Sequence, residues 1–371
     1  MTEIKKIFVC STEQSGDNIS SNILKKIKNN NNFIVDGVGG SKSAKYFRKK
    51  YLDISEFKAM GIVEVLLSLS KYIKIINFLS KEIISNKYDL LITIDSPDFN
   101  YQLAKKIRKK NFKNKIIHIV APSVWAWRRG RARKFANIYD EIFTLFKFEN
   151  EFFNKFGLKT TFIGHPVYHI SSVNNQVDKK YIAFLPGSRE KEIKQLFDYY
   201  ELAYKILSKD KTKEFHIFIP TLPHLEKLIN IKTNHWKIKT IVTTDPKKIE
   251  DYFNEVYVSV TCSGTASIEI AKRMIPQLVI YKFNIFTSII GKFFVKVKYA
   301  NLINVFSNRM IIPELTNFNL TKKKFTNEFE LLINNKKRNH EQLFQIKESV
   351  KYFENNKSPY DLCVNRIMEL I

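Results

Sequence analysis

The sequence has only three cysteines among its 371 residues, Cys10, Cys262 and Cys363. Their spacing fits neither a zinc site nor a disulfide framework, which favours a reducing compartment. No segment reaches the ~18 uncharged apolar residues that a bilayer span needs. The N-terminal residues also lack the apolar run of a secretory signal. We therefore expect a cytoplasmic protein without a membrane-spanning helix.

Motifs of several nucleotide-binding classes are also missing. The sequence contains no Asp-x-Asp pair to hold a metal against a diphosphate, no Gly-x-x-x-x-Gly-Lys-Ser/Thr loop, and no zinc finger or RNA-binding aromatic motif. Acidic residues are few, 36 against 62 basic ones, so the formal charge is +26. Such a charge attracts nucleic acid, anionic lipid or phosphorylated substrates. Because the basic residues are spread along the chain, charge alone does not choose among these partners.

Short apolar runs alternate with helix-like segments through most of the chain. In the first half, helix-like segments lie at 20–30, 44–50, 101–110 and 148–157. The strand-like runs are 7–11, 33–39, 90–95, 116–122, 141–146 and 160–164, followed by 181–188, 215–221, 238–244, 257–263 and 277–282. Strands that alternate with helices predict parallel sheets built from right-handed crossovers.

A polar segment at 170–179 separates two halves of similar size, as a linker would. The sequence therefore predicts an α/β protein with two Rossmann-like domains that face each other across a cleft. We place the first domain at residues 1–170 and the second at 171–371. The last helix of the chain could cross back to the first domain.

Ligands of such sheets bind where strands end and loops lead into helices. In the first half, Asp95 follows the strand at 90–94, and a carboxylate at this position could act as a general base. Asp98 could be a simple helix cap, and the same holds for Asp17. The loop after the first strand contributes four further candidates: Glu13, Ser15, Gly16 and Asp17.

Tryptophan and arginine cluster after the strand at 116–120. Trp125, Trp127 and Arg128 begin this cluster, which continues with three more arginines up to residue 133. Arginine suits bidentate phosphate contacts and tryptophan suits a boundary between apolar and aqueous surroundings. Upstream, residues 61–79 place Leu66 and Leu67 among lysines. This segment predicts either an amphipathic helix in a membrane interface or an ordinary helix packed on the sheet.

Two loops in the second half suit an anionic ligand. Gly187, Ser188 and Arg189 lie between a strand and a helix, and Ser263, Gly264 and Thr265 repeat this arrangement further along. A helix N-terminus favours phosphate binding. Glu269 lies one turn into the second helix and could accept hydrogen bonds from a ribose, or simply favour the helix by ~0.3–1 kcal/mol. Asn304 and Arg309 belong to a polar cluster downstream.

Taken in order, these segments resemble one known family. They are SGD at 15–17, GVGG at 37–40, MGIVEVL at 60–66, IDSPDFN at 94–100, PSVWAWR at 122–128, FIGHP at 162–166, LPGSREKEI at 185–193 and SGTASIE at 263–269. The chain resembles the lipid-A-disaccharide synthases, and the resemblance covers most of residues 5–315. Thr12 stands where that family usually has Gly, and Ser41 where it usually has Pro; these differences bear on the fine shape of the first-domain pocket.

The resemblance implies an inverting glycosyltransferase with a glycosyltransferase B fold. The donor would be UDP-2,3-diacylglucosamine and the acceptor 2,3-diacylglucosamine 1-phosphate (lipid X). The products would be a β-1,6-linked disaccharide 1-phosphate, used for lipopolysaccharide, and UDP. Asp95 would be the base, and no metal or other cofactor would be needed. The protein would lie peripherally on the anionic inner face of the inner membrane and bind no nucleic acid; a homodimer stays open.

The same resemblance assigns the other candidates. The UDP side would comprise Gly187, Ser188, Arg189, Ser263, Gly264, Thr265, Glu269, Asn304 and Arg309. Substrate positioning would fall to Glu13, Ser15, Gly16 and Asp17. Membrane or acyl contacts would come from Leu66, Leu67, Trp125, Trp127 and Arg128. Two other hypotheses remain: a UDP-sugar 2-epimerase of the same fold, which would lack PSVWAW, and a nucleic-acid-binding protein, which only the charge favours.

Overall fold

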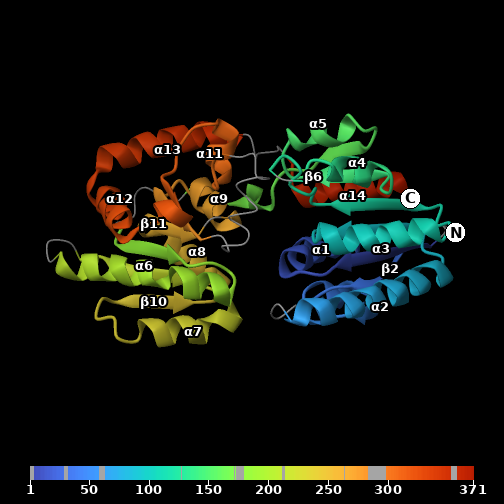
Figure 1. The fold of residues 1–371 in the computed structure, drawn as a ribbon, viewed down its shortest axis with the longest axis horizontal. Helices are drawn as coiled ribbons and strands as arrows, with labels where there is room; N and C mark the ends of the chain where they lie inside the picture. Colours follow the sequence, from blue (N-terminus) through green and yellow to red (C-terminus); the bar gives the residue numbers. More distant parts are fainter. Residues whose placement is uncertain are drawn as a thin grey trace. The chain divides into compact units, whose positions relative to one another are not determined.

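The computed structural model describes residues 4–28, 32–57, 63–126, 128–170, 172, 179–210, 214–262, 264–282, 298–351 and 357–371, with only the backbone for 63–69, 168, 169 and 318. The chain divides into two compact units (Figure 1). Unit 1 comprises Met1–Tyr168 and Phe353–Ile371, and unit 2 comprises His169–Tyr352. The division lies two residues before the boundary expected at 170. The last helix, α14 (Pro359–Leu370), belongs to unit 1, the crossing that the sequence left open.

Unit 1 is built on a seven-stranded parallel sheet of order β3-β2-β1-β4-β5-β6-β7. Its strands are β1 (Lys5–Ser11), β2 (Phe33–Val38), β3 (Lys49–Leu52), β4 (Leu90–Ile94), β5 (Lys115–Ile119), β6 (Glu141–Thr144) and β7 (Lys159–Phe162). Its other helices are α1 (Gln14–Ile27), α2 (Val63–Ser85), α3 (Pro97–Lys109), α4 (Arg131–Ala136) and α5 (Glu149–Asn154), with short 3-10 turns η1 (Ser43–Tyr46), η2 (Ile54–Phe57) and η3 (Pro166–His169).

Both faces of this sheet are covered by helices, as parallel sheets require. Every residue of β4 is buried, which explains its continuous apolar sequence LLITI. On one face, α1 and α14 pack through Ile23 and Ile367. On the other face, α2 and α3 pack through Leu79 and Leu103. The strand ends that lead into α1 and α3 are therefore held rigidly from both sides.

Unit 2 repeats this plan with a six-stranded parallel sheet of order β10-β9-β8-β11-β12-β13. Its strands are β8 (Tyr181–Leu185), β9 (His216–Pro220), β10 (Thr240–Thr243), β11 (Val256–Cys262), β12 (Gln277–Tyr281) and β13 (Glu314–Thr316). Its helices are α6 (Glu190–Lys209), α7 (Pro223–Thr233), α8 (Pro246–Asn254), α9 (Thr265–Lys272), α11 (Leu302–Ser307), α12 (Lys322–Asn334) and α13 (Lys336–Val350), with the short turn η4 (Asn317–Asn319).

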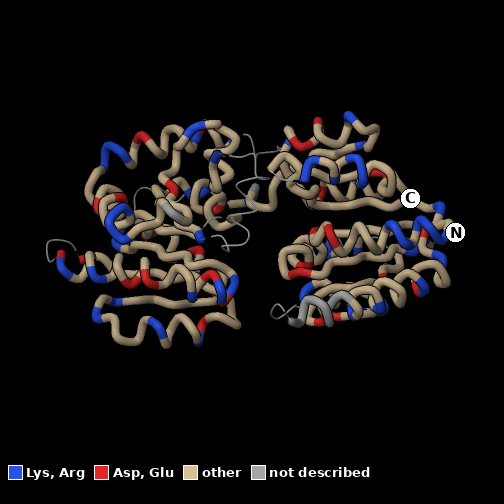
Figure 2. Tube along the Cα trace, viewed as in Figure 1, with Lys and Arg blue, Asp and Glu red and all other residues tan. Residues whose placement is uncertain are grey.

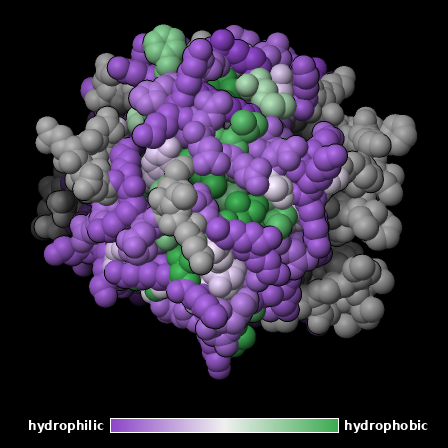
Figure 3. Space-filling model, turned by 90° about the vertical axis from the view of Figure 1, so that its left-hand side faces the viewer, coloured by the Kyte–Doolittle hydropathy of each residue, from purple (hydrophilic) through white to green (hydrophobic). Residues whose placement is uncertain are grey.

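The core of unit 2 also has two layers. Helices α6, α7 and α12 pack on one face of the sheet, and α8 and α9 contribute to the apolar cluster on the other. Lys and Arg are distributed over both units with Asp and Glu among them (Figure 2). The face of unit 2 that Figure 3 shows is mainly hydrophilic, with a small hydrophobic area near its centre. Among the described residues, no helix has the length and apolarity to cross a membrane.

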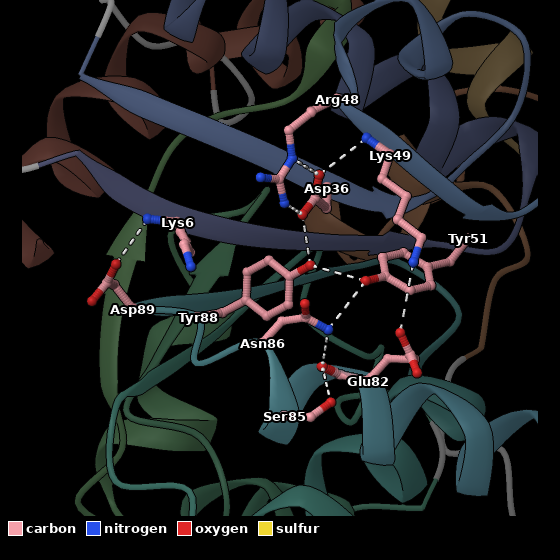
Figure 4. Close-up of polar contacts among 10 residues, drawn as sticks. All are labelled: Lys6, Asp36, Arg48, Lys49, Tyr51, Glu82, Ser85, Asn86, Tyr88 and Asp89. Atoms are coloured by element: carbon pink, nitrogen blue, oxygen red, sulfur yellow. Dashed lines mark hydrogen bonds and ion pairs between the residues drawn. The ribbon is translucent and has the colours of Figure 1, made fainter.

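The helix predicted at 44–50 is wrong. The chain there forms the short turn η1 and then the edge strand β3. The cause is the completely buried carboxylate of Asp36, which binds the Arg48 guanidinium and accepts the backbone N–H of Lys49 at 3.0 Å (Figure 4). The Tyr88 hydroxyl donates to the same carboxylate at 2.7 Å. The buried Asp36 carboxylate would cost several kcal/mol without a partner, roughly the cost of an unpaired buried charge. Its pairing with Arg48 and Lys49 therefore outweighs the local preference of this segment for a helix.

Candidate active site

Each sheet reverses its strand order once, between β1 and β4 in unit 1 and between β8 and β11 in unit 2. In open α/β sheets, ligands bind beyond the carboxyl ends of the strands at this switch point. The four loops that the sequence singled out for Glu13, Asp95, Arg189 and Gly264 follow these four strands. The topology therefore gives each unit one candidate half-site.

In unit 1, the loop after β4 holds Asp95 in an unusual conformation. Asp95 and Ser96 both adopt positive φ, 56° and 43°, which turns the chain sharply before α3. One carboxylate oxygen of Asp95 accepts the Ser15 hydroxyl at 2.5 Å, and the other accepts the Ser96 N–H at 2.8 Å. The Asn100 amide holds the Asp95 carbonyl at 2.7 Å. Strained residues fixed by their surroundings often mark functional sites, and here the result is an oriented, partly buried carboxylate.

The first turn of α1 supports this loop. A Cβ on Gly16 would lie 3.1 Å from the Ile94 carbonyl oxygen and 3.5 Å from the Asp95 Cβ, so glycine permits the close approach of α1 to β4. Asp17 is completely buried, and its carboxylate accepts the N–H groups of Gly40 and Ser43 at 2.8 and 3.1 Å. Asp17, which the resemblance assigns to substrate positioning, holds the GVGG segment against α1 through these contacts.

A groove of about 840 Å³ begins beside the Asp95 loop. Its floor includes three aromatic rings, with Phe57 and Phe99 in edge contact at 4.9 Å and Tyr72 5.9 Å from Phe99. The exposed side chain of Glu13 and that of Ser96 also line the groove. Lysines of α3 complete the lining: Lys105, Lys106 and Lys109, with Lys110 just after the helix. The volume lies within the ~300–1,000 Å³ of typical small-molecule sites.

The tryptophan loop after β5 is anchored by a residue that the sequence did not suggest. Trp125 is partly buried, and its indole N–H donates to the Glu149 carboxylate at 3.2 Å. Glu149 is nearly inaccessible at 2%, and burial raises its pKa to about 8. Arg128 is exposed and lies 3.7 Å from the Asp98 carboxylate. Trp127 lies outside the described residues.

Helix α2 packs on the sheet of unit 1, which is one of the two alternatives that the sequence left open for this segment. Its inward face is core, because Leu79 and Ile83 are completely buried. Ile73 and Phe78 remain 56% and 44% exposed, and Ile73 lines the groove. Leu66 and Leu67 lie in the part of α2 whose side chains are not described. The helix therefore packs on the sheet and still presents apolar side chains outward.

In unit 2, the loop between β8 and α6 turns at Gly187, whose φ of +112° strongly favours glycine. The N–H groups of Ser188 and Arg189 donate to the Glu192 carboxylate at 3.1 and 3.3 Å. The Arg189 side chain is 72% exposed. The sequence did not single out Glu192, although its place three residues after Arg189 is the spacing of a capping box.

The loop after β11 starts α9 at Gly264, with Thr265 exposed in its first turn. Gly264 has a φ of +136°, and a Cβ added there would meet no atom of the described residues within 4 Å. Ser263 lies outside the described residues. Glu269 is partly buried one turn later; burial raises its pKa, and the nearby Arg273 opposes that rise.

The loops of unit 2 come together at the carboxyl edge of its sheet. Burial raises the pKa of the Cys262 thiol, at the end of β11, to about 12. The Glu192 charge adds to this rise and the Arg189 charge opposes it. The same two charges act on Tyr281 at the end of β12. The loop after β8 therefore lies beside the ends of β11 and β12.

The two candidates downstream of β12 have different surroundings. Asn304 is completely buried, and its side-chain oxygen accepts the N–H groups of Ile311 and Ile312 at 2.8 and 2.9 Å. Its side-chain nitrogen donates to the Ile312 carbonyl at 2.7 Å. Asn304, which the resemblance assigns to the UDP side, holds through these contacts the chain that leads into β13. Arg309 is exposed. Across the described ranges, no group of three or more His, Cys, Asp or Glu side chains could hold a metal ion.

The solved structures that are similar share this two-sheet architecture. MurG of Acinetobacter baumannii matches with a TM-score of 0.63 at 12% identity, covering 98% of this chain and 99% of its own. A UDP co-structure of MnaA from S. aureus gives 0.62 at 15% identity, covering 99% and 98%. The fold, with a candidate half-site at each switch point, is that of the glycosyltransferase B class.

Sequence comparison identifies the family within this class. A family model described as lipid-A-disaccharide synthetase matches residues 7–365. The lipid-A-disaccharide synthase of Rickettsia bellii (strain OSU 85-389) is 35% identical, covering 89% of this chain and 90% of its own. That of Rickettsia prowazekii (strain Madrid E) is 32% identical, covering 96% and 97%. The chain belongs to the lipid-A-disaccharide synthase family.

Proposed function

We propose that this chain transfers 2,3-diacylglucosamine from its UDP derivative to the 6-hydroxyl of 2,3-diacylglucosamine 1-phosphate. The observation that carries the proposal is the oriented Asp95 carboxylate at the switch point of unit 1, in a chain that matches the family model over residues 7–365. A general base needs this combination of fixed geometry and partial access.

The proposed chemistry is a single displacement with inversion. The Asp95 carboxylate takes the proton of the acceptor 6-hydroxyl as that oxygen attacks the anomeric carbon of the donor. The bond from that carbon to the phosphate oxygen breaks, and UDP leaves with the electron pair. Ser15 and the Ser96 N–H keep the carboxylate aimed through their hydrogen bonds.

Unit 2 would bind the donor nucleotide. The exposed Arg189 guanidinium and the start of α9 at Gly264 offer positive charge to the departing diphosphate. Glu269, one turn further along α9, would accept hydrogen bonds from the ribose diol. We propose that these groups suffice without a metal ion, so activity should persist in EDTA. A loss of activity in EDTA that Mg²⁺ restores would contradict this part of the proposal.

The acylated parts of the substrates would use the groove of unit 1 and a membrane surface. The groove combines an aromatic floor with lysines of α3, and α2 exposes Ile73 and Phe78 near this basic face. We propose peripheral binding to the anionic cytoplasmic face of the inner membrane, where each nearby basic residue contributes ~1 kcal/mol. The protein should sediment with anionic vesicles at low salt and be released near ~1 M salt. Sedimentation that does not change with salt concentration would rule out an electrostatic contribution to membrane binding.

The remaining hypotheses separate in two assays. UDP should raise the thermal unfolding temperature. Duplex DNA at physiological salt should not raise it, because the positive charge of the protein would attract DNA only non-specifically. A 2-epimerase would consume the UDP-sugar in the absence of an acceptor. The proposed transferase should instead form disaccharide only when both acylated sugars are present.

A further inference from the structure

The loop between β8 and α6 directs its backbone donors toward a carboxylate of the chain itself. Glu192, in the first turn of α6, accepts the N–H groups of Ser188 and Arg189 through one oxygen. The loop closes so tightly over this carboxylate that a Cβ on Gly187 would lie 2.6 Å from the same oxygen. These two N–H groups are therefore already paired, and the exposed side chains of Ser188 and Arg189 are the groups of this loop that can meet a ligand.

The second oxygen of Glu192 acts on that side chain. It lies 3.4 Å from the Arg189 guanidinium, while the Glu192 side chain is 17% exposed and that of Arg189 is 72% exposed. A surface ion pair of this length contributes little to stability. It does, however, bias the direction in which a long side chain points. One carboxylate thus fixes both the backbone of the loop and the orientation of its cation.

This pair belongs to the loop that follows β8, one of the two strands at the switch point of the sheet of unit 2. The charges of Glu192 and Arg189 both act on Cys262 and Tyr281, at the ends of β11 and β12. Gly264, which starts α9, follows Cys262 by two residues. Because β8 and β11 are neighbouring parallel strands, with Leu185 paired to Thr261, the loop that carries Arg189 lies at the edge of the sheet at which α9 begins.

We propose that Glu192 is a positioning residue of the donor site. It holds residues 187–189 so that the Arg189 guanidinium, rather than the N–H groups of Ser188 and Arg189, contacts the diphosphate of the donor. The inference rests on the proposed function, since it takes a nucleoside diphosphate as the ligand. A capping box without this role would stabilise α6 and leave nucleotide affinity unchanged.

Two substitutions separate the reach of Glu192 from its charge. Glu192→Gln keeps one oxygen for the two N–H groups, but it removes the charge and turns an NH2 group, which cannot accept a hydrogen bond, toward the Arg189 guanidinium. Glu192→Asp keeps the charge on a side chain one methylene shorter. UDP affinity is measured by calorimetry, and unfolding temperature is measured alongside. We expect Glu192→Gln, which loses only the contact with the guanidinium, to bind UDP about three- to tenfold more weakly than wild type, and Glu192→Asp, which loses the hold on the backbone, to bind at least about tenfold more weakly. Glu190→Gln is the matched control, because it removes a charge from the same helix turn, where Glu190 pairs with Lys194 at 2.7 Å.

Several results would overturn the proposal. Wild-type UDP affinity in Glu192→Asp, with a lower unfolding temperature, would make Glu192 a helix cap and nothing more. Tighter binding in either variant would mean that the carboxylate competes with the diphosphate. Should Glu192→Asp not fold, Glu192→Ala provides a second test, since it removes the carboxylate and leaves Gly187, whose φ of +112° an alanine would strain, unchanged. A wild-type protein that fails to bind UDP would instead refute the proposed function.

Discussion

Removing the Ser15 hydroxyl tests how the base is held. Its hydrogen bond to Asp95, at 2.5 Å, joins a hydroxyl to a charged group, a type worth ~1.5–3 kcal/mol. Each ~1.4 kcal/mol corresponds to a tenfold change in rate, so complete loss would cost about ten- to a hundredfold. Because the Ser96 N–H still holds the other oxygen, we expect Ser15→Ala to lower kcat about tenfold. Asp95→Asn should lower it by ~10²–10⁴, the range for losing a general base.

The decisive measurement is the kcat of the Ser15→Ala/Asp95→Asn double variant in a steady-state transfer assay. If Ser15 acts through Asp95, Ser15→Ala should cost almost nothing in the Asp95→Asn background, while UDP affinity stays at the wild-type value in all three proteins. Effects that multiply would show that Ser15 acts independently of Asp95. Near-normal turnover of Asp95→Asn would remove Asp95 from the mechanism and leave Glu13 as the candidate. Ser21→Ala is the control, since Ser21 lies on the same helix and donates to the Asn18 carbonyl.

Three further predictions follow from the surrounding contacts. Glu269→Gln and Arg189→Ala should each weaken UDP binding in calorimetry, and added Mg²⁺ should not restore it; unchanged affinity would remove either residue from the nucleotide site. Burial in the folded state raises the pKa of Glu149 from 4.5 to about 8. The protonated Glu149 side chain therefore contributes fully to the free energy of unfolding below pH ~4.5. This contribution is lost as the pH rises toward 8, by up to ~1.4 kcal/mol per pH unit. Urea unfolding of Glu149→Gln should lack this component, and an identical pH dependence would show that Glu149 is not responsible. Tyr88→Phe removes a 2.7 Å hydrogen bond to the buried Asp36 and should destabilise unit 1 by ~1.5–3 kcal/mol in urea; a loss under ~0.5 kcal/mol would mean that the other partners of this carboxylate suffice.

The sequence was most informative about the sheets and the loops at their switch points. Runs such as LLITI are buried on both faces, and this alone makes them recognisable as strands of parallel sheets. It was least informative about the sheet edges. The segment 44–50 has a helical composition, yet its last residues form β3, because the Lys49 N–H donates to Asp36 on the neighbouring strand. The three-residue strand β13 is too short to produce a periodic pattern.

The same contrast holds for the candidate site. Asp95 is recognisable because a carboxylate after a buried strand has few local roles. Asn304 is assigned to the UDP side by the family resemblance, and its contacts with Ile312 add a structural role that no local pattern reveals. Glu149 and Glu192 were not predicted from the sequence. Each binds a residue that the sequence did single out: Glu149 binds Trp125, and Glu192 binds Arg189.

Transfer of an isotopically labelled sugar tests the central claim most directly. The protein is incubated in EDTA with UDP-2,3-diacylglucosamine labelled in its sugar ring and with unlabelled 2,3-diacylglucosamine 1-phosphate. Mass spectrometry with fragmentation then locates the label, and released UDP is quantified. The account predicts one UDP per disaccharide 1-phosphate, with all of the label in the ring that lacks the phosphate. Consumption of the UDP-sugar without any labelled disaccharide would contradict it.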